Sequence, residues 1–159
     1  MDWAGIAKLI HVAIAFAFVS GLIGRWIVLR RAAAARDPET AYQLAEAAGP
    51  FEWLVIRGGP AIMLAGFVTA WAQGYAWLGL TTGWILASVI LLVSPLPLVP
   101  LIFLPRGQRF AAEMASAREQ GVITPGLKAA FADPMVALAR RWEAISVSLV
   151  IVLMILKPF

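Results

Sequence analysis

Four long apolar stretches limit what this sequence can fold into. They cover residues 4–29, 60–78, 84–104 and 142–156. A helix needs about 20 consecutive, mainly apolar residues to cross the hydrocarbon core of a bilayer, and these stretches come near that length. With 62% hydrophobic and only 14% charged residues, a soluble domain could not bury its apolar surface. The sequence predicts an all-α integral membrane protein, with residues 1–159 forming a single four-span domain.

Charge is distributed unevenly between the connections of these stretches. Eleven of the 13 lysines and arginines flank the first and third connections, whereas only Lys8 and Lys157 lie toward the opposite side. The second connection, around QGYAWLGLTTG, carries no charge. Because basic loops stay in the cytoplasm, we expect both termini outside it, in a bacterial cytoplasmic (inner) membrane. This topology accounts for the net charge of +4 without a nucleic-acid partner.

The first stretch differs from a cleaved signal peptide. It lacks a basic n-region, and it ends in Arg30 and Arg31 rather than in a small-residue cleavage site. We therefore expect it to be a permanent span.

Both long connections contain helix signals. In RDPETAYQLAEAAGP, Asp37 is suited to an N-cap, Pro38 to a first turn and the final Gly-Pro to a stop, which predicts a helix over 38–48. In the third connection, RGQRFAAEMASAREQG predicts a helix that ends at Gly121, followed by a turn at TPG. A second Asp-Pro pair, which begins at Asp133, predicts the start of the last helix. We expect these short helices to form a cytoplasmic cap.

Prolines interrupt the third stretch. Pro95, Pro97, Pro100 and Pro105 each remove a backbone donor, so a straight helix over 84–104 is excluded. Irregular backbone at membrane depth must pack against protein or line a wet cavity. Two hypotheses follow: a kink accommodated by neighbouring helices, or a broken helix that shapes a pocket, as in transporters.

The only histidine, His11, lies inside the first stretch, one turn from Lys8. It could form an interhelix hydrogen bond to Gln73, Ser88 or a carbonyl. It could also be an axial ligand of haem or of a metal, or it could transfer protons. With one histidine and no cysteine, a second axial ligand would be Met154, Lys8 or a residue of a neighbouring subunit.

Small residues on the first stretch favour close helix packing. Ala17 and Gly21, and likewise Ser20 and Gly24, have the small-x-x-x-small spacing found where membrane helices touch. We expect these four residues to face a neighbouring helix.

Five charged residues are expected at similar depth near the cytoplasmic ends of the spans. An unpaired charge there would be costly, so we expect ion pairs that define the order of the helices. The alternative is a gate or a proton path. The residues are Arg25, Glu52, Arg57, Arg106 and Glu143.

Three segments carry a resemblance to a known family. KLIHVAIAFAFVSGLIGRW, GGPAIMLAGFVTAW and VLMILKPF resemble the bacterial predicted integral membrane protein family, domain of unknown function 2269. Members of that family share a K-x-x-H-V opening, a Pro and a Gly in the second helix, and an M-x-x-K-P ending. The resemblance spans nearly the whole chain and implies a four-helix membrane protein. The matching residues are His11, Pro60, Gly66, Met154, Lys157 and Pro158.

A more distant similarity is to the four-helix protoporphyrinogen oxidase and copper-resistance membrane families, which also carry a first-helix histidine. In the oxidase family that histidine is associated with haem and works with a lysine in a later helix. In this sequence Lys128 lies in a loop and Lys157 at the outer end. The similarity therefore does not extend to the oxidase activity.

We conclude that the sequence predicts an antiparallel four-helix membrane bundle with a proline-kinked third span. We expect a non-enzymatic function in the lipid bilayer, as an accessory or ligand-binding protein, as a subunit of a larger complex, or as a homo-oligomer. The alternatives are a haem-dependent membrane redox enzyme that uses His11, and a small transporter. A transporter would need polar residues through the whole depth of the bundle.

Overall fold

The computed structural model describes residues 2–158, and the regular structure in this range is entirely helical. The chain is therefore all-α, as predicted. In chain order the elements are α1 (Trp3–Ala33), α2 (Pro38–Ala47), α3 (Gly49–Ala72), the 3-10 turn η1 (Ala76–Gly79), α4 (Gly83–Val93), the π-helical segment η2 (Val99–Phe103), α5 (Leu104–Gln120), α6 (Pro125–Phe131) and α7 (Pro134–Leu156).

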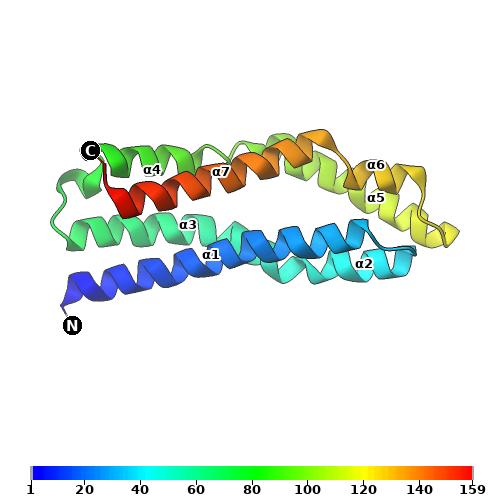
Figure 1. The fold of residues 1–159 in the computed structure, drawn as a ribbon, viewed down its shortest axis with the longest axis horizontal. Coiled ribbons are helices and arrows are strands. Elements are labelled where there is room, and N and C mark those ends of the chain that lie inside the picture. Colours follow the sequence, from blue (N-terminus) through cyan, green and yellow to red (C-terminus); the bar gives the residue numbers. More distant parts are fainter. Residues whose placement is uncertain (1, 159) are drawn as a thin grey trace.

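The long helices form two antiparallel pairs (Figure 1). α1 packs chiefly against α3, and α4 packs against α7, whereas contacts between the two pairs are sparse. We call them the α1/α3 pair and the α4/α7 pair. Both ends of the chain lie at one end of the molecule, and α2, α5 and α6 lie toward the other end.

Local capping signals account for several helix ends. The Asp37 side chain accepts a hydrogen bond of 2.8 Å from the Thr40 N–H, and α2 begins at the next residue, Pro38. Gly121 ends α5 in the left-handed conformation, with φ of 68°. Asp133 accepts hydrogen bonds from two N–H groups in the first turn of α7. These three predictions from the sequence are confirmed, and each depends on a side chain that satisfies free groups at a helix end or on a glycine that reverses the chain.

Two proline-containing segments form different structures from those that the sequence predicts. α3 begins at Gly49 and continues through Pro60, although we expected Gly49 to be part of a stop and Pro60 to be near a helix start. The TPG segment begins α6, with Thr124 as its N-cap, and is not merely a turn. The reason is that proline fits the first helical turn as well as the residues that follow a helix. Membrane helices also tolerate an internal proline.

The third apolar stretch is interrupted where its prolines lie. α4 ends at Val93, a turn follows, and the chain continues through η2 into α5. The interruption contacts α7, because the indole Nε1 of Trp142 donates a hydrogen bond of 3.0 Å to the hydroxyl of Ser94. α7 therefore packs against the interrupted segment.

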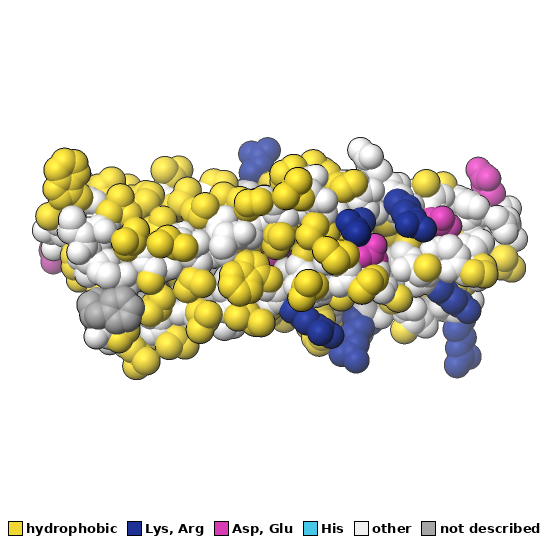
Figure 2. Space-filling model, turned by 90° about the horizontal axis from the view of Figure 1, so that it is seen from above, with side chains coloured by type: hydrophobic (Ala, Val, Ile, Leu, Met, Phe, Trp, Pro, Cys, Tyr) yellow, Lys and Arg dark blue, Asp and Glu magenta, His cyan; other side chains and the backbone are white. Residues whose placement is uncertain are grey.

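Apolar side chains cover much of the outer surface of the long helices. Leu64 on α3 is 64% exposed and Trp26 on α1 is 53% exposed, which is typical of a surface that faces lipid. In Figure 2, hydrophobic side chains cover the end that holds the termini, and Lys and Arg side chains lie mainly toward the other end. Two helical runs, Trp3–Ala33 and Pro38–Ala72, are long and apolar enough to cross a membrane.

The helices at the other end have a hydrophobic core of their own. Ala41 of α2, Met114 and Ala117 of α5 and Leu127 of α6 are all buried there. The rings of Phe110 and Phe131 pack edge to face beside this core, 4.9 Å apart. α2, α5 and α6 therefore form a folded cap rather than loose loops.

Candidate functional site

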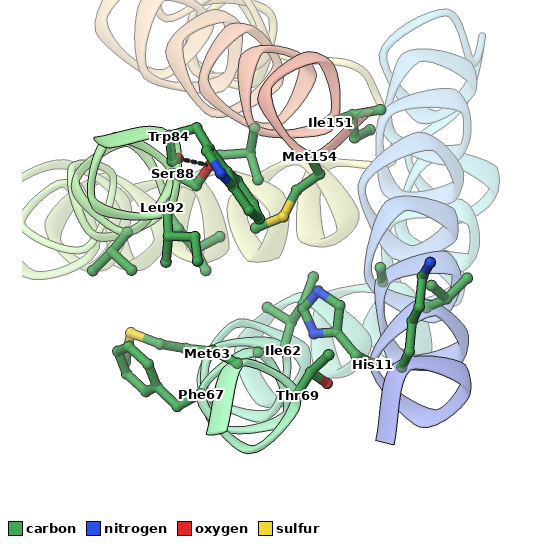
Figure 3. Close-up of a pocket in the computed structure, with 18 of the residues that line it drawn as sticks. His11, Ile62, Met63, Phe67, Thr69, Trp84, Ser88, Leu92, Ile151 and Met154 are labelled. Carbon is green, nitrogen blue, oxygen red and sulfur yellow. Dashed lines mark hydrogen bonds between the residues drawn. The ribbon is translucent and has the colours of Figure 1, made fainter. Parts of the chain in front are cut away.

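A cavity of about 730 Å³ lies between the α1/α3 pair and the α4/α7 pair. Figure 3 shows it from close by, with lining side chains from all four helices. We call it the interhairpin cavity. Its lining is polar toward the end that holds the termini, where it includes Lys8, Gln73, Tyr75 and Lys157. Farther from the termini the lining is apolar, with Phe18, Ile62, Leu92 and Val147.

His11 lines this cavity from α1. Its ring lies beside Ile62 of α3 (Figure 3), and a Cβ atom at Gly66 would stand only 3.2 Å from the imidazole Cε1. The glycine therefore lets the ring rest on the backbone of α3. Within residues 2–158, the buried Nδ1 atom of His11 has no hydrogen-bond partner of good geometry, although the imidazole interacts with the backbone of Ile62. Because Nδ1 is buried against α3, a molecule in the cavity would meet the imidazole through the rest of its ring.

His11 interacts with the backbone of Ile62, and a second residue also links α1 to α3. The Thr69 hydroxyl donates to the Ala7 carbonyl over 3.1 Å and so links α3 to α1. Ser88, one of the partners considered for His11, instead donates to the Trp84 carbonyl of its own helix over 2.7 Å. Sequence reasoning missed Thr69, although a threonine in an apolar stretch is a recognised candidate for such a bond.

The structure brings the candidate axial ligands to one cavity. Met154 lines it from α7, on the side opposite His11 (Figure 3). Lys8 lines it from α1. Within residues 2–158, no three acidic or histidine side chains lie together as a metal ion would require. Of the candidate axial ligands, His11 belongs to the α1/α3 pair and Met154 to the α4/α7 pair. These two residues therefore line the cavity from opposite sides.

Four of the six residues that carry the family resemblance also converge here. His11, Gly66, Met154 and Lys157 come from α1, α3 and the end of α7 and line the interhairpin cavity, whereas Pro60 and Pro158 do not. They are far apart in the sequence, so the fold is what brings them together.

A buried ion pair joins the two helix pairs outside the interhairpin cavity. Arg25 of α1 donates to Glu143 of α7 over 2.6 Å, and their side chains are 11% and 12% exposed. The Arg25 guanidinium also lies 5.9 Å from the centre of the Phe103 ring in η2. Arg140 interacts electrostatically with Arg25, Glu143 and Glu52. Three of the five charged residues considered above, Arg25, Glu52 and Glu143, therefore belong to one neighbourhood.

The other two charged residues lie apart from this neighbourhood. Arg106 pairs with Asp133 over 2.9 Å, and Arg57 is exposed. Partial burial acts to raise the pKa of Asp133. Hydrogen bonds from the N–H groups of Val136 and Met135 and from Arg106 outweigh this effect and hold the pKa below its usual value. The Arg106–Asp133 pair thus fastens α5 to the start of α7.

The small residues of α1 divide into two groups. A Cβ atom at Gly21 would lie 2.9 Å from the carbonyl oxygen of Phe51, and one at Gly24 would overlap the ring of the same phenylalanine. These two glycines therefore allow α1 to approach α3 closely. Ala17 and Ser20 are exposed.

Comparison with known proteins agrees with the membrane character of the chain. No curated protein and no solved structure gave a significant match. One family model, described as predicted integral membrane protein (DUF2269), matches residues 5–158. The matched range includes every residue that lines the interhairpin cavity. The chain therefore belongs to this family of predicted integral membrane proteins.

Proposed function

We propose that this protein is a four-span membrane protein that binds an apolar small molecule in the interhairpin cavity. In this proposal it has no catalysis of its own and works as an accessory protein or as a subunit of a larger complex. The observation that carries the proposal is the cavity itself, which has apolar walls and includes His11 in its lining.

Helix lengths support four crossings. α3 has 24 residues, about 36 Å at 1.5 Å per residue, which is enough for a hydrocarbon core of about 30 Å. α7 has 23 residues and a similar length, but it carries Arg140, Arg141 and Glu143, so its crossing requires these groups to lie at the membrane surface or inside the bundle. α1 is longer, and the run from α4 through η2 covers the third apolar stretch. The basic connections support an orientation with both termini outside the cytoplasm of a bacterial cell.

The size and lining of the cavity support ligand binding. Small-molecule sites have volumes of about 300–1,000 Å³ and combine apolar walls with a few placed polar groups. The cavity of about 730 Å³ lies within this range. Its lining includes no carboxylate that could orient or activate His11, which supports binding without catalysis.

A pair of matched variants tests this proposal. Ala15 lines the cavity, whereas Ala13 of the same helix is exposed. Ala15→Phe should fill the cavity, and Ala13→Phe should add only a lipid-facing ring. We expect native mass spectrometry of the purified protein to show a copurified small molecule on the wild type and on Ala13→Phe, and to show its loss from Ala15→Phe. Equal retention by both variants, or no bound molecule on the wild type, would contradict the proposal.

A second candidate is a haem-binding membrane redox protein. It is favoured by the positions of His11 and Met154, whose imidazole and thioether line the cavity from opposite helix pairs. These two groups fit the axial positions of a haem iron, and a bound haem would supply one-electron chemistry. The transporter alternative has less support, because the part of the lining away from the termini is apolar.

A further inference from the structure

We propose that the ligand of the interhairpin cavity is an anionic amphiphile, with an acyl-type chain between the helix pairs and an acid group held by Lys8 and Lys157. This inference rests on the proposed function and deepens it by naming the ligand class. The shared chemistry is a carboxylate or phosphate joined to a long apolar chain, which a free fatty acid and an anionic phospholipid both provide.

The first observation is the polarity of the cavity along its length. Along α1 the lining runs from Lys8 and His11, near the termini, to Phe18 and Val19. On α7 it runs in the matching direction, from Lys157 down to Val147. A ligand that satisfies both ends must have one charged or polar end and one apolar end.

The second observation is the charge at the polar end. Lys8 and Lys157 come from opposite helix pairs, and among residues 2–158 the lining of the cavity includes no Asp or Glu to neutralise them. The Lys157 Nζ lies 5.4 Å from the centre of the Trp84 ring, which keeps this ammonium beside the cavity. Two ammonium groups beside an apolar cavity favour an anion, and carboxylate or phosphate oxygens accept strong charge-assisted hydrogen bonds.

The third observation is the depth of the cavity. Residues 8–19 of α1 line it, a length of about 16 Å at 1.5 Å per residue. One leaflet of a bilayer has a hydrocarbon thickness of about 15 Å, half of the whole core. The cavity therefore matches the depth that an acyl chain occupies when its headgroup stays at the membrane surface.

Quenching of Trp84 fluorescence by brominated amphiphiles tests the inference. Trp84 lines the cavity and is only 8% exposed, so bilayer lipids outside the protein do not reach it. The protein is placed in zwitterionic phosphatidylcholine nanodiscs and titrated with 9,10-dibromostearate, or with the dibromostearyl alcohol as a chain-matched neutral control. The Trp84 signal is the difference between the wild type and Trp84→Phe. We expect the acid to quench this signal at a concentration about tenfold lower than the alcohol, as expected for one charge-assisted hydrogen bond.

Variants of the two lysines complete the test. Lys8→Gln and Lys157→Gln should each weaken acid binding about tenfold and leave alcohol binding unchanged. Lys128→Gln is the matched control, because Lys128 lies on α6, away from the interhairpin cavity. Should both lysine variants bind the acid like the wild type, the lysines would only reach toward lipid headgroups, and the inference would be wrong.

The outcomes also separate this inference from the proposed function. Equal quenching by acid and alcohol would overturn the anionic preference and leave an apolar ligand site. No quenching of Trp84 by either compound would overturn the ligand site itself. A further titration with phosphatidylglycerol brominated on its acyl chains identifies the source of the acid group. Stronger quenching than with stearate indicates a lipid headgroup, and weaker quenching indicates a free fatty acid.

Discussion

The imidazole of His11 rests on the α3 backbone because residue 66 is a glycine. This position buries Nδ1 without giving it a partner within the part of the chain described, residues 2–158. The hydroxyl of Thr69 also links these two helices. A molecule in the interhairpin cavity would meet the part of the imidazole that faces away from α3.

We predict that His11→Gln changes the stability of the protein little and its ligand content more. Glutamine keeps a donor and an acceptor, so the variant should fold with a loss of stability no larger than about 0.6–2 kcal/mol. We expect wild-type protein, expressed with ample haem, to show a featureless visible absorption spectrum, and His11→Gln to carry less of the copurified small molecule. A Soret band in the wild type that disappears in His11→Gln would instead establish the haem-binding candidate.

Sequence reasoning could find the candidate residues of the site but not their partners. His11 and Lys8 stand out because polar residues are rare in apolar stretches. Which residue of α3 meets His11 depends on how closely α1 and α3 approach and on their relative register. That approach depends on Gly21 and its contact with Phe51, which no spacing within one helix predicts.

The α1–α3 contact is the most extensive contact between two helices in residues 2–158, and its glycines make it testable. A side chain at residue 21 would collide with the carbonyl oxygen of Phe51, a backbone atom that cannot rotate away. We expect Gly21→Leu to destabilise the protein by about 1–3 kcal/mol or more, the usual effect of overpacking. Thermal unfolding in detergent measures the change.

The matched control for this prediction is Ser20→Leu. Ser20 is the neighbouring residue but is exposed, so an added leucine would face lipid and should change the unfolding temperature little. Similar losses in both variants would mean that the α1–α3 contact is not as close as the structure indicates.

Helix ends were predictable where one side chain determines them. Asp37 and Asp133 each accept hydrogen bonds from the turn that follows them, an interaction that needs no tertiary context. The start of α3 at Gly49 was not predictable, because Gly-Pro occurs both after a helix and within its first turn. In this chain Gly49 and Pro50 follow the end of α2 and also form the first turn of α3.

The whole molecule consists of two helix pairs joined at few points. The Arg25–Glu143 ion pair connects them with both side chains nearly buried, and the interhairpin cavity separates them nearer the termini. In a low-dielectric environment neither charge is stable alone, so the pair keeps the helix pairs in register. The molecule can therefore keep a cavity open at one end without losing the arrangement of its helices.

The orientation of the whole chain in the membrane can also be predicted. Eleven of the 13 lysines and arginines flank the first and third connections, and such loops remain in the cytoplasm. In a bacterial host, alkaline phosphatase fused after Phe159 should therefore be active, and green fluorescent protein fused there should be dark. Fluorescent protein inserted after Gly121, at the end of α5, should be bright.

These fusions test α7 as well as the orientation. Its apolar part, residues 144–156, is short for a crossing, and Arg140, Arg141 and Glu143 lie just before it. The buried Arg25–Glu143 pair lets the helix take one of these charges into the bundle rather than into lipid, so a full crossing is feasible. Fluorescence from both fusion sites would mean that α7 does not cross the membrane. Reversed signals at both sites would mean that α7 crosses in the opposite orientation.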